Sequence, residues 1–258
     1  MQLSDGARAV YRWQPMDAPV NGLAIVCLPT YNERENIERM LRAIGAAAPG
    51  VRVLVVDDNS PDGTGAIADR LAAELGYVDV LHRHEKQGLG PAYIAGFRRA
   101  LELGADLVLE MDCDFSHDPA ALPSLLAAAA DADLVLGSRY VPGGSVVDWG
   151  LSRRLISSFG SVYARIVLGI GVRDLTGGFK CYRRAALEAI DLDAVASKGY
   201  AFQIETTYRV LRKGLRVAEV PIRFADRELG GSKMSRSIVL EAMWKVPALR
   251  LAALAGRL

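Results

Sequence analysis

Short apolar runs alternate with segments of helical periodicity through the first half of the chain. The apolar runs predict strands at Leu23–Leu28, Val51–Val56, Val78–His82, Leu107–Met111 and Asp133–Gly137. The segments between them predict helices at Glu33–Ala48, Gly63–Leu75, Pro91–Leu103 and Pro119–Ala130. Because such alternation is typical of βαβ units, we predict an α/β fold with a Rossmann-like, mostly parallel central sheet and helices on both faces.

The alternation changes after residue 150. Leu151–Ile170 has the pattern of an amphipathic helix, Ala201–Arg212 predicts a helix and Arg216–Pro221 a strand. Ile238–Leu258 reads as a basic, apolar tail that Pro247 breaks. We therefore expect a leader over residues 1–22, one main domain over 23–235 and a helical basic and apolar tail over 236–258.

Composition narrows the class of protein. With 258 residues, 51% of them hydrophobic, the chain is long enough for one large α/β domain. Its three cysteines, Cys27, Cys113 and Cys181, are scattered, which predicts reduced thiols in a cytosolic setting. His82, His84 and His117 lack metal-ligand spacing, so we expect no metal role for them.

The formal net charge of +1 hides an uneven distribution. Residues 1–138 carry a net charge of −9 and residues 139–258 a net charge of +10. An acidic half suits a bound cation, and a basic half suits phosphates or an anionic membrane surface. Chance clustering of surface charges is the alternative. We expect no nucleic-acid partner.

Polar segments follow four of the predicted strands. They are Pro29–Glu33, Asp57–Asp62, Asp112–His117 and Ser138–Tyr140. Ligands of open parallel sheets bind outside the carboxyl ends of the strands, so these segments predict one shared site.

Asp112 and Asp114 give the sharpest local signal. Two carboxylates that close together need a counter-ion or a raised pKa. A Mg²⁺ or Mn²⁺ ion shared with substrate phosphates meets this need, because such ions take a couple of carboxylates plus phosphate oxygens. The alternative is a solvated loop in which Asp118 caps the next helix.

The other strand ends offer groups for a nucleotide. Asp58, beside Asp57, is placed to accept hydrogen bonds from ribose or base. Tyr31 can stack on a base, and Glu33 either accepts from the nucleotide or favours a helix N-terminus. Gly88-Leu89-Gly90 lacks the third glycine of a dinucleotide site, so we interpret it as a close approach of backbone to a neighbour or ligand.

Taken together, the motifs resemble those of a known family. They are Pro29-Thr-Tyr-Asn-Glu33, Val56-Asp57-Asp58, Gly88-Leu-Gly90, Asp112-Cys-Asp114 and Gly137-Ser-Arg-Tyr140. In this order and spacing they resemble the inverting family-two glycosyltransferases of the GT-A fold, over residues 23–235. Four later motifs resemble polyprenyl (dolichyl) phosphate mannose synthases: Asp174-Leu-Thr-Gly-Gly-Phe-Lys180, Gly199-Tyr-Ala-Phe-Gln-Ile-Glu205, Glu219-Val-Pro-Ile222 and Arg227-Glu-Leu-Gly-Gly-Ser-Lys233.

The resemblance implies transfer of mannose from GDP-mannose to a polyprenyl phosphate with inversion, giving polyprenyl phosphate β-mannose and GDP. It implies a divalent metal, Mg²⁺ or Mn²⁺, on Asp112 and Asp114. Ser116 is a third candidate ligand, although some members carry a glutamine there. The implied donor-binding residues are Pro29, Tyr31, Glu33, Val56, Asp58, Asp112, Cys113, Asp114, Arg139, Lys180, Arg227 and Lys233.

The resemblance assigns catalysis to Asp114, Arg139, Arg227 and Lys233. A phosphate monoester, with a second pKa of about 6, is largely dianionic and needs no general base. The obstacle is repulsion between two anionic substrates, so cations are expected to pair with the phosphates. For the lipid phosphate the candidates are Arg139, Arg153 and Arg154. Lys180 either meets the donor or pairs with Glu205.

The lipid acceptor requires access to a membrane. The sequence has no uncharged apolar run of about 20 residues, so we expect no transmembrane helix. We expect a peripheral protein on the cytoplasmic face of the membrane, held by Leu151–Ile170 and the tail or by a membrane-anchored partner. Alternatives are a transferase for another sugar such as glucose, a non-catalytic nucleotide-sugar or lipid-binding module, and a Rossmann-type oxidoreductase, which the absent glycine motif disfavours.

Overall fold

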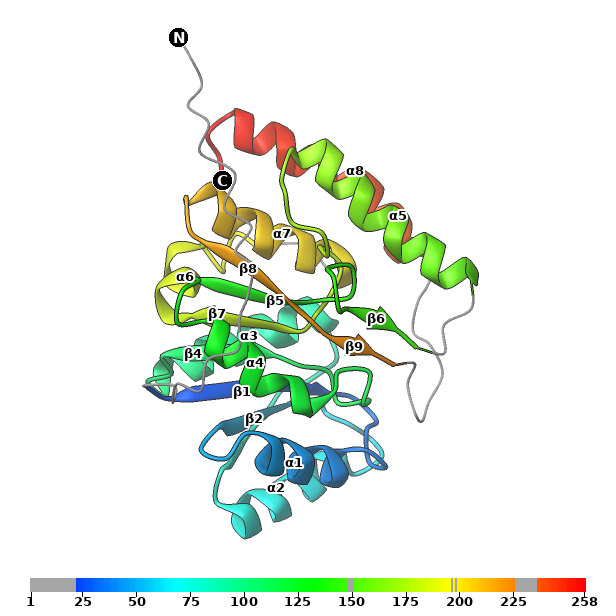
Figure 1. The fold of residues 1–258 in the computed structure, drawn as a ribbon. Coiled ribbons are helices and arrows are strands. Elements are labelled where there is room, and N and C mark those ends of the chain that lie inside the picture. Colours follow the sequence, from blue (N-terminus) through cyan, green and yellow to red (C-terminus); the bar gives the residue numbers. More distant parts are fainter. Residues whose placement is uncertain (1–21, 148–150, 196, 198, 226–235) are drawn as a thin grey trace.

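The computed structural model describes residues 22–147, 151–195, 197, 199–225 and 236–258, and for 151–156, 200 and 236–242 only the course of the backbone. Seven strands form the central sheet in the order β3-β2-β1-β4-β7-β5-β8. Their bounds are β1 Ala24–Thr30, β2 Arg52–Asp57, β3 Val78–His82, β4 Leu107–Glu110, β5 Leu134–Ser138, β7 Lys180–Arg183 and β8 Val217–Pro221 (Figure 1). All the strands predicted from the sequence are therefore present.

Six of these strands run parallel, and only β7 is antiparallel to its neighbours β4 and β5. The carboxyl ends of β1, β2, β4 and β5 consequently lie along one edge of the sheet. The mostly parallel sheet is confirmed, whereas β7 was not predicted. Its four residues alternate: Cys181 enters the hydrophobic cluster on one face, and Tyr182 enters the cluster on the other.

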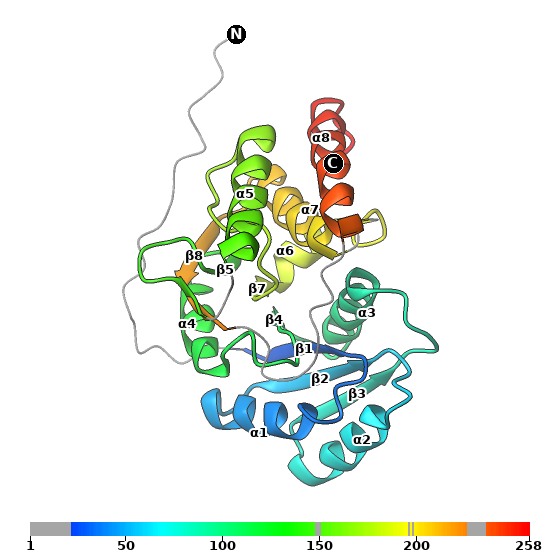
Figure 2. The same cartoon turned by 90° about the vertical axis from the view of Figure 1, so that its right-hand side faces the viewer.

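Helices cover both faces of the sheet, as expected (Figure 2). One face packs against α1 (Ile37–Ala47), α2 (Thr64–Leu75) and α4 (Leu122–Ala128), and the other against α3 (Leu89–Glu102), α5 (Leu151–Leu168), α6 (Arg184–Ala189), α7 (Gly199–Arg212) and α8 (Arg236–Leu254). β1 serves both cores, because Val26 and Leu28 face one cluster while Ile25 and Cys27 face the other. No helix within the described ranges is long and apolar enough to cross a membrane.

Smaller elements flank the carboxyl edge. The 3₁₀ helix η1 (Pro119–Ala121) precedes α4, so the single helix predicted over Pro119–Ala130 is divided. Strands β6 (Ser145–Val146) and β9 (Arg223–Phe224) pair in parallel as a separate two-stranded sheet. His117 forms a bridge to Phe224, which brings β9 beside the loop that follows β4.

The expectation that Pro247 breaks the C-terminal tail is wrong, because α8 continues through it. A proline inside a helix leaves the carbonyl four residues earlier without its amide donor. That carbonyl belongs to Met243, and the Tyr163 hydroxyl of α5 donates to it at 2.9 Å. Val246, Leu249 and Ala253 are buried, so α8 is part of the core. Of the expected leader over residues 1–22, only Gly22 is among the described residues.

This contact predicts a measurable coupling between α5 and α8. Tyr163→Phe removes the donor to the Met243 carbonyl and should lower the free energy of unfolding by about 1 kcal/mol in urea titrations. In a Pro247→Ala background the restored amide satisfies the same carbonyl, so Tyr163→Phe should cost clearly less. An equal cost in both backgrounds would show that the hydroxyl does not replace the amide.

Candidate active site

Asp57 at the end of β2 organises the first part of the carboxyl edge. Its carboxylate accepts from the Thr30 hydroxyl at 3.1 Å and from the amide and hydroxyl of Ser60 at 3.1 and 2.5 Å. Ser60 in turn accepts from the amide of Asn32 at 3.1 Å, and Thr64 accepts from the amide of Glu33 at 3.0 Å. The loops after β1 and β2 are thereby fixed to each other. Helix α1 begins at Ile37, four residues later than the sequence predicted.

Two cations after β3 contact residues that the sequence predicted to bind the nucleotide. Arg83 makes a salt bridge to Asp58, and the Lys86 ammonium lies 3.9 Å from the centre of the Tyr31 ring. Burial raises the pKa of Asp58 and outweighs the opposing effect of Arg83. Sequence reasoning did not single out Arg83 or Lys86. Their position directly after a parallel strand is the signal that could have identified them.

The remaining nucleotide candidates differ in exposure. Pro29 pairs with Val56 in the β1–β2 register, and Pro29 is partly buried. The Val56 side chain is fully buried in the core beneath α3, so any contact with a ligand would involve its backbone. The Glu33 carboxylate accepts from the Asn36 side chain at 2.9 Å, at the start of α1.

The two aspartates after β4 are held by different partners. Asp112 accepts from the Tyr93 hydroxyl of α3 at 3.0 Å, and its amide donates to Nδ1 of His117 at 3.1 Å. Asp114 accepts from the amide and hydroxyl of Ser116 at 3.1 and 2.6 Å. Thus Ser116 orients Asp114, and its role as a metal ligand stays a prediction.

The neighbours of this pair are buried or serve as caps. Cys113, between the two aspartates, is buried. Asp118 accepts from the amide of Ala120 at 2.9 Å and caps η1. This agrees with the alternative interpretation of the segment, but only for Asp118.

His117 is a site residue that the sequence analysis undervalued. Its ring is buried between Phe179, with ring centres 5.0 Å apart, and the edge-on Phe224 at 5.3 Å. Burial lowers the pKa of His117 and outweighs the nearby aspartates, in agreement with an Nδ1 that accepts a hydrogen bond. Neutral His117 therefore fixes the backbone of Asp112. Its place three residues after Asp114, in the same turn, was the available signal.

The donor set around Asp112 and Asp114 fits an ion that shares its ligands with a substrate. Within the described part of the chain, no group of three or more histidine, cysteine, aspartate and glutamate side chains could enclose a metal. The donor atoms around Asp112 and Asp114 therefore do not suit a closed structural zinc site, which needs four protein ligands. Two carboxylates and a hydroxyl do suit Mg²⁺ or Mn²⁺ completed by diphosphate oxygens.

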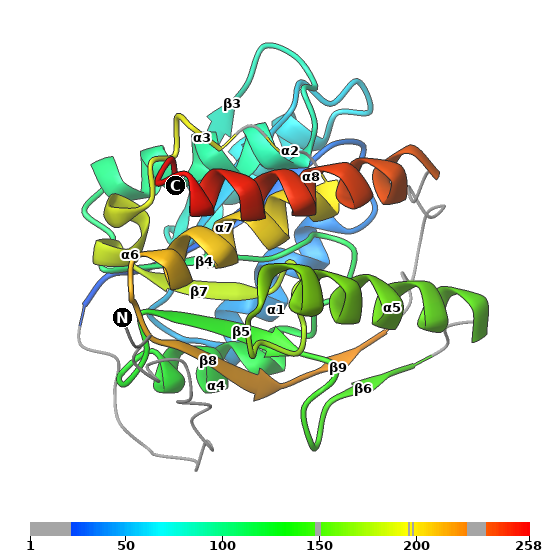
Figure 3. The same ribbon diagram turned by 90° about the horizontal axis from the view of Figure 1, so that it is seen from above.

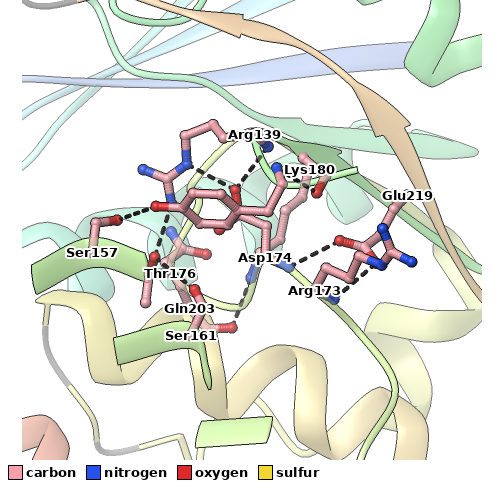
Figure 4. A network of polar contacts seen from close by, with 11 residues as sticks. Arg139, Ser157, Ser161, Arg173, Asp174, Thr176, Lys180, Gln203 and Glu219 are labelled. Carbon is pink, nitrogen blue, oxygen red and sulfur yellow. Dashed lines mark hydrogen bonds and ion pairs between the residues drawn. The ribbon is translucent and has the colours of Figure 1, made fainter. Parts of the chain in front are cut away.

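Arg139, directly after β5, forms a buried ion pair with Asp174 (Figure 4). Nε and Nη2 of Arg139 each lie 2.7 Å from a carboxylate oxygen, and the Arg139 amide donates to the same group at 3.0 Å. Nη2 also donates to Thr176 at 2.8 Å. Burial would raise the pKa of Asp174, but Arg139 offsets this and holds it below the ordinary value of 3.8. The guanidinium is therefore rigidly placed at the sheet edge.

Hydrogen bonds extend from this pair to β8 and α5. Glu219 accepts from the amides of Arg173 and Asp174 at 2.8 and 2.9 Å, which joins two motifs that are far apart in the sequence. On the other side, the hydroxyls of Thr176 and Ser161 lie 3.3 Å apart. The Tyr140 hydroxyl donates to Ser157 at 2.9 Å, so the loop that carries Arg139 is bonded to α5 directly through Tyr140 and indirectly through Thr176.

Lys180 lies beneath the site. Its ammonium is fully buried and donates to the Gln203 carbonyl at 2.8 Å and to Thr206 at 3.2 Å. Burial lowers its pKa to about 8, against the opposing effect of Glu110 and Asp174. The expected alternative of a Lys180–Glu205 pair is wrong, because Glu205 bonds to Ser197 and to Arg209 instead.

Glu110, the register partner of Lys180, is also buried and accepts from the Tyr182 hydroxyl at 2.9 Å. Burial raises the pKa of this carboxyl more than Lys180 lowers it. Gly90 was expected to allow a close approach, and this is confirmed: a Cβ there would lie 2.8 Å from the Ser197 carbonyl oxygen.

Four predicted cations have no described side-chain position. Arg227 and Lys233 lie outside the described residues, and so does most of their motif. Arg153 and Arg154 lie in the first turn of α5, where only the backbone is described. Their roles stay predictions.

The site thus combines a pair of aspartates, the polar and aromatic groups after β1 and β2, and a fixed arginine. The Glycosyl transferase family 2 model matches residues 25–191. The chain belongs to this family. Its enzyme class, glycosyltransferase, follows, and the resemblance drawn from the motifs is confirmed.

Relatives place the chain more closely within the family. An undecaprenyl-phosphate mannosyltransferase of Micrococcus luteus is 55% identical over 229 residues, which cover 89% of this chain and 94% of the relative. A polyprenol monophosphomannose synthase of Mycolicibacterium smegmatis is 53% identical over 224 residues, covering 86% and 84%.

Solved structures share the fold at lower identity. Glucosyl-3-phosphoglycerate synthase of Mycobacterium tuberculosis, in complex with UDP, superposes with a TM-score of 0.66 at 19% identity, covering 92% of this chain and 86% of the other. A mannosyltransferase of Pyrobaculum calidifontis in complex with GDP-Man and Mn²⁺ superposes with a TM-score of 0.57 at 18% identity, covering 94% and 78%. The GT-A fold is confirmed.

The predicted metal role of Asp112 can be tested through Tyr93, which donates to its carboxylate. Tyr93→Phe removes the hydrogen bond that orients this carboxylate and should weaken Mn²⁺ affinity about tenfold, as measured by calorimetry in the presence of GDP. Tyr208→Phe is the control, because the buried Tyr208 hydroxyl has no partner among the described residues. Equal Mn²⁺ affinities in the two variants would contradict a role for Tyr93.

Asp174→Asn should leave Arg139 buried and uncompensated. We expect a free energy of unfolding about 3–5 kcal/mol lower at neutral pH in urea titrations. Because the folded pKa of Asp174 is lowered, its contribution is present above the ordinary value of 3.8 and is lost as the pH falls through the folded pKa. The difference between wild type and variant should therefore shrink in acid.

The double variant Arg139→Met/Asp174→Leu provides the comparison, since it removes both charges and should be more stable than Asp174→Asn alone. A stability difference between wild type and Asp174→Asn that is independent of pH would contradict the buried ion pair.

Proposed function

We propose that this protein transfers mannose from GDP-mannose to a polyprenyl phosphate with inversion at the anomeric carbon. The observation that carries the proposal is the pair of relatives, each more than half identical over most of the chain. One is named an undecaprenyl-phosphate mannosyltransferase and the other a polyprenol monophosphomannose synthase. The site contains residues suited to each part of the reaction.

The donor is bound along the carboxyl ends of β1, β2 and β4. Tyr31 and Asp58 contact the nucleoside, beside Lys86 and Arg83. Asp112 and Asp114 would hold a divalent cation, which would neutralise charge on the departing diphosphate. The Pyrobaculum neighbour, which has the same fold, is described in complex with GDP-Man and Mn²⁺, and this supports both choices.

The acceptor needs positioning rather than activation. A lipid phosphate monoester, with a second pKa of about 6, is already nucleophilic at neutral pH. Arg139 orients the attacking phosphate from the end of β5, where Asp174 fixes its guanidinium. Arg153 and Arg154 supply further positive charge from α5, and Arg227 and Lys233 cover the donor. Attack from the side opposite the leaving diphosphate inverts the anomeric centre.

The enzyme acts at a membrane surface, because its acceptor is a lipid. We propose peripheral attachment on the cytoplasmic face. The basic half of the sequence, with a net charge of +10 over residues 139–258, supports attraction to anionic headgroups.

A transfer assay tests this function. Purified protein should move label from GDP-mannose to polyprenyl phosphate in the presence of Mg²⁺ or Mn²⁺, and Asp114→Ala should lower the rate at least about 100-fold. Asp118→Asn is the matched control, since Asp118 is exposed and caps η1.

Two results would contradict the proposal. Lipid-linked label from UDP-glucose alone would identify a glucosyltransferase in place of a mannosyltransferase. Unchanged turnover by Asp114→Ala would remove the metal-binding role of that carboxylate.

A further inference from the structure

The outer side of α5 is apolar. Phe159, Val162 and Ile166 form one stripe along the helix, and Phe159 and Ile166 are 70% and 75% exposed. The inner side already packs on the core through Ala164 and Leu168. A surface helix of a protein surrounded by water normally presents polar residues outward. The side of α5 that faces away from the core is therefore unusual.

The neighbouring helix α8 repeats this pattern. Its exposed large side chains are Met243, Trp244, Leu251 and Leu254, with Trp244 82% exposed. Across residues 157–168 and 243–254, where side chains are described, every exposed side chain is apolar. The charged residues in these two ranges are Arg165, Lys245 and Arg250, all cationic.

The two stripes belong to one surface. The Tyr163 hydroxyl contacts the Met243 carbonyl, and Arg250 donates to the Leu168 carbonyl at 3.0 Å, so α5 and α8 lie side by side in parallel (Figure 3). We call the exposed residues Phe159, Val162, Ile166, Met243, Trp244, Leu251 and Leu254 the α5–α8 face. Large exposed apolar areas with cations at their edges mark membrane or protein interaction sites.

We propose that the α5–α8 face docks on the surface of an anionic bilayer, with its apolar side chains in the interfacial region and its cations at the headgroups. This inference rests on the proposed function for its biological role. Trp, Phe and Leu opposite Lys and Arg are the composition of helices that lie in the membrane interface. A second copy of the chain is a poorer occupant, because two identical faces would bring like charges together.

The α5–α8 face is connected to the candidate active site through α5. Ser157 and Ser161 lie on α5 and bond to Tyr140 and Thr176, which adjoin Arg139. Docking therefore brings the Arg139 loop to the depth of the lipid headgroups. The phosphate of a polyprenyl phosphate lies at that depth, so the acceptor reaches the site while its chain remains in the bilayer.

Vesicle binding by the full chain tests the docking directly. Phe159→Glu/Trp244→Glu should weaken co-sedimentation with phosphatidylcholine–phosphatidylglycerol vesicles about tenfold or more, because binding strength scales with buried apolar area. The charge-matched control is Ala46→Glu/Ala73→Glu, which alters exposed positions on α1 and α2, on the side of the sheet away from α5 and α8. It should bind almost as well as wild type.

Fluorescence reports the depth of insertion. The sequence has three tryptophans, so Trp13→Phe/Trp149→Phe leaves Trp244 alone. Its emission should shift to the blue on addition of the anionic vesicles. No shift, or equal vesicle binding by the two Glu double variants, would overturn the docking proposal.

A comparison of acceptors separates this proposal from the proposed function. Phe159→Glu/Trp244→Glu should lose transfer to vesicle-borne polyprenyl phosphate but keep wild-type transfer to a short, water-soluble prenyl phosphate. Wild-type protein that transfers to neither acceptor would contradict the function and leave the vesicle result standing. Failure of wild type to bind protein-free vesicles would overturn the docking and assign the face to a protein partner. Sedimentation velocity that shows wild-type dimers and monomeric Phe159→Glu/Trp244→Glu would assign it to a second copy.

Discussion

The buried ion pair between Arg139 and Asp174 connects most of the residues around the proposed acceptor side of the site. Its side chains are 3% and 0% exposed, so neither charge is stabilised by water. Asp174 is held by Glu219 of β8 through backbone amides, and Thr176 passes the contact to Ser161 of α5. A single desolvated pair thus fixes β5, β8 and α5 around the proposed position of the acceptor phosphate. Rigid placement of this kind is what catalysis by positioning requires.

The donor side is governed by a related electrostatic problem. Four aspartates lie along one edge of the sheet because parallel strands end there, and each has a neighbour that offsets or orients it. Asp57 is satisfied by hydroxyls and an amide, Asp58 by Arg83, and Asp114 by Ser116. Asp112 depends on Tyr93, which reaches the site from α3 through a stacked aromatic core that includes Phe202. The geometry of the aspartates is therefore set partly by the hydrophobic interior.

The sequence predicted the parallel strands and the polar segments at their ends because each is a local signal of periodicity followed by turn chemistry. It did not predict β7, which is short and begins with Lys180. This lysine can be buried in a strand only because its ammonium donates to the Gln203 carbonyl and to Thr206. The Arg139–Asp174 and Glu219–Asp174 contacts join residues 35 and 45 positions apart, beyond the reach of any local pattern. The same holds for Arg83 and Lys86, whose partners Asp58 and Tyr31 directly follow β2 and β1. Tertiary pairing, rather than propensity, decided those features.

The hydroxyl of Tyr163 stands in for an amide that Pro247 cannot provide. The contact completes the main-chain bonding of α8, so separating the two helices would leave the Met243 carbonyl without a protein donor. The helices α5 and α8 should accordingly tilt and translate together as one rigid unit. In a lineage of such enzymes, replacement of the proline removes the need for the tyrosine. These two positions, 84 residues apart, are then expected to change in concert.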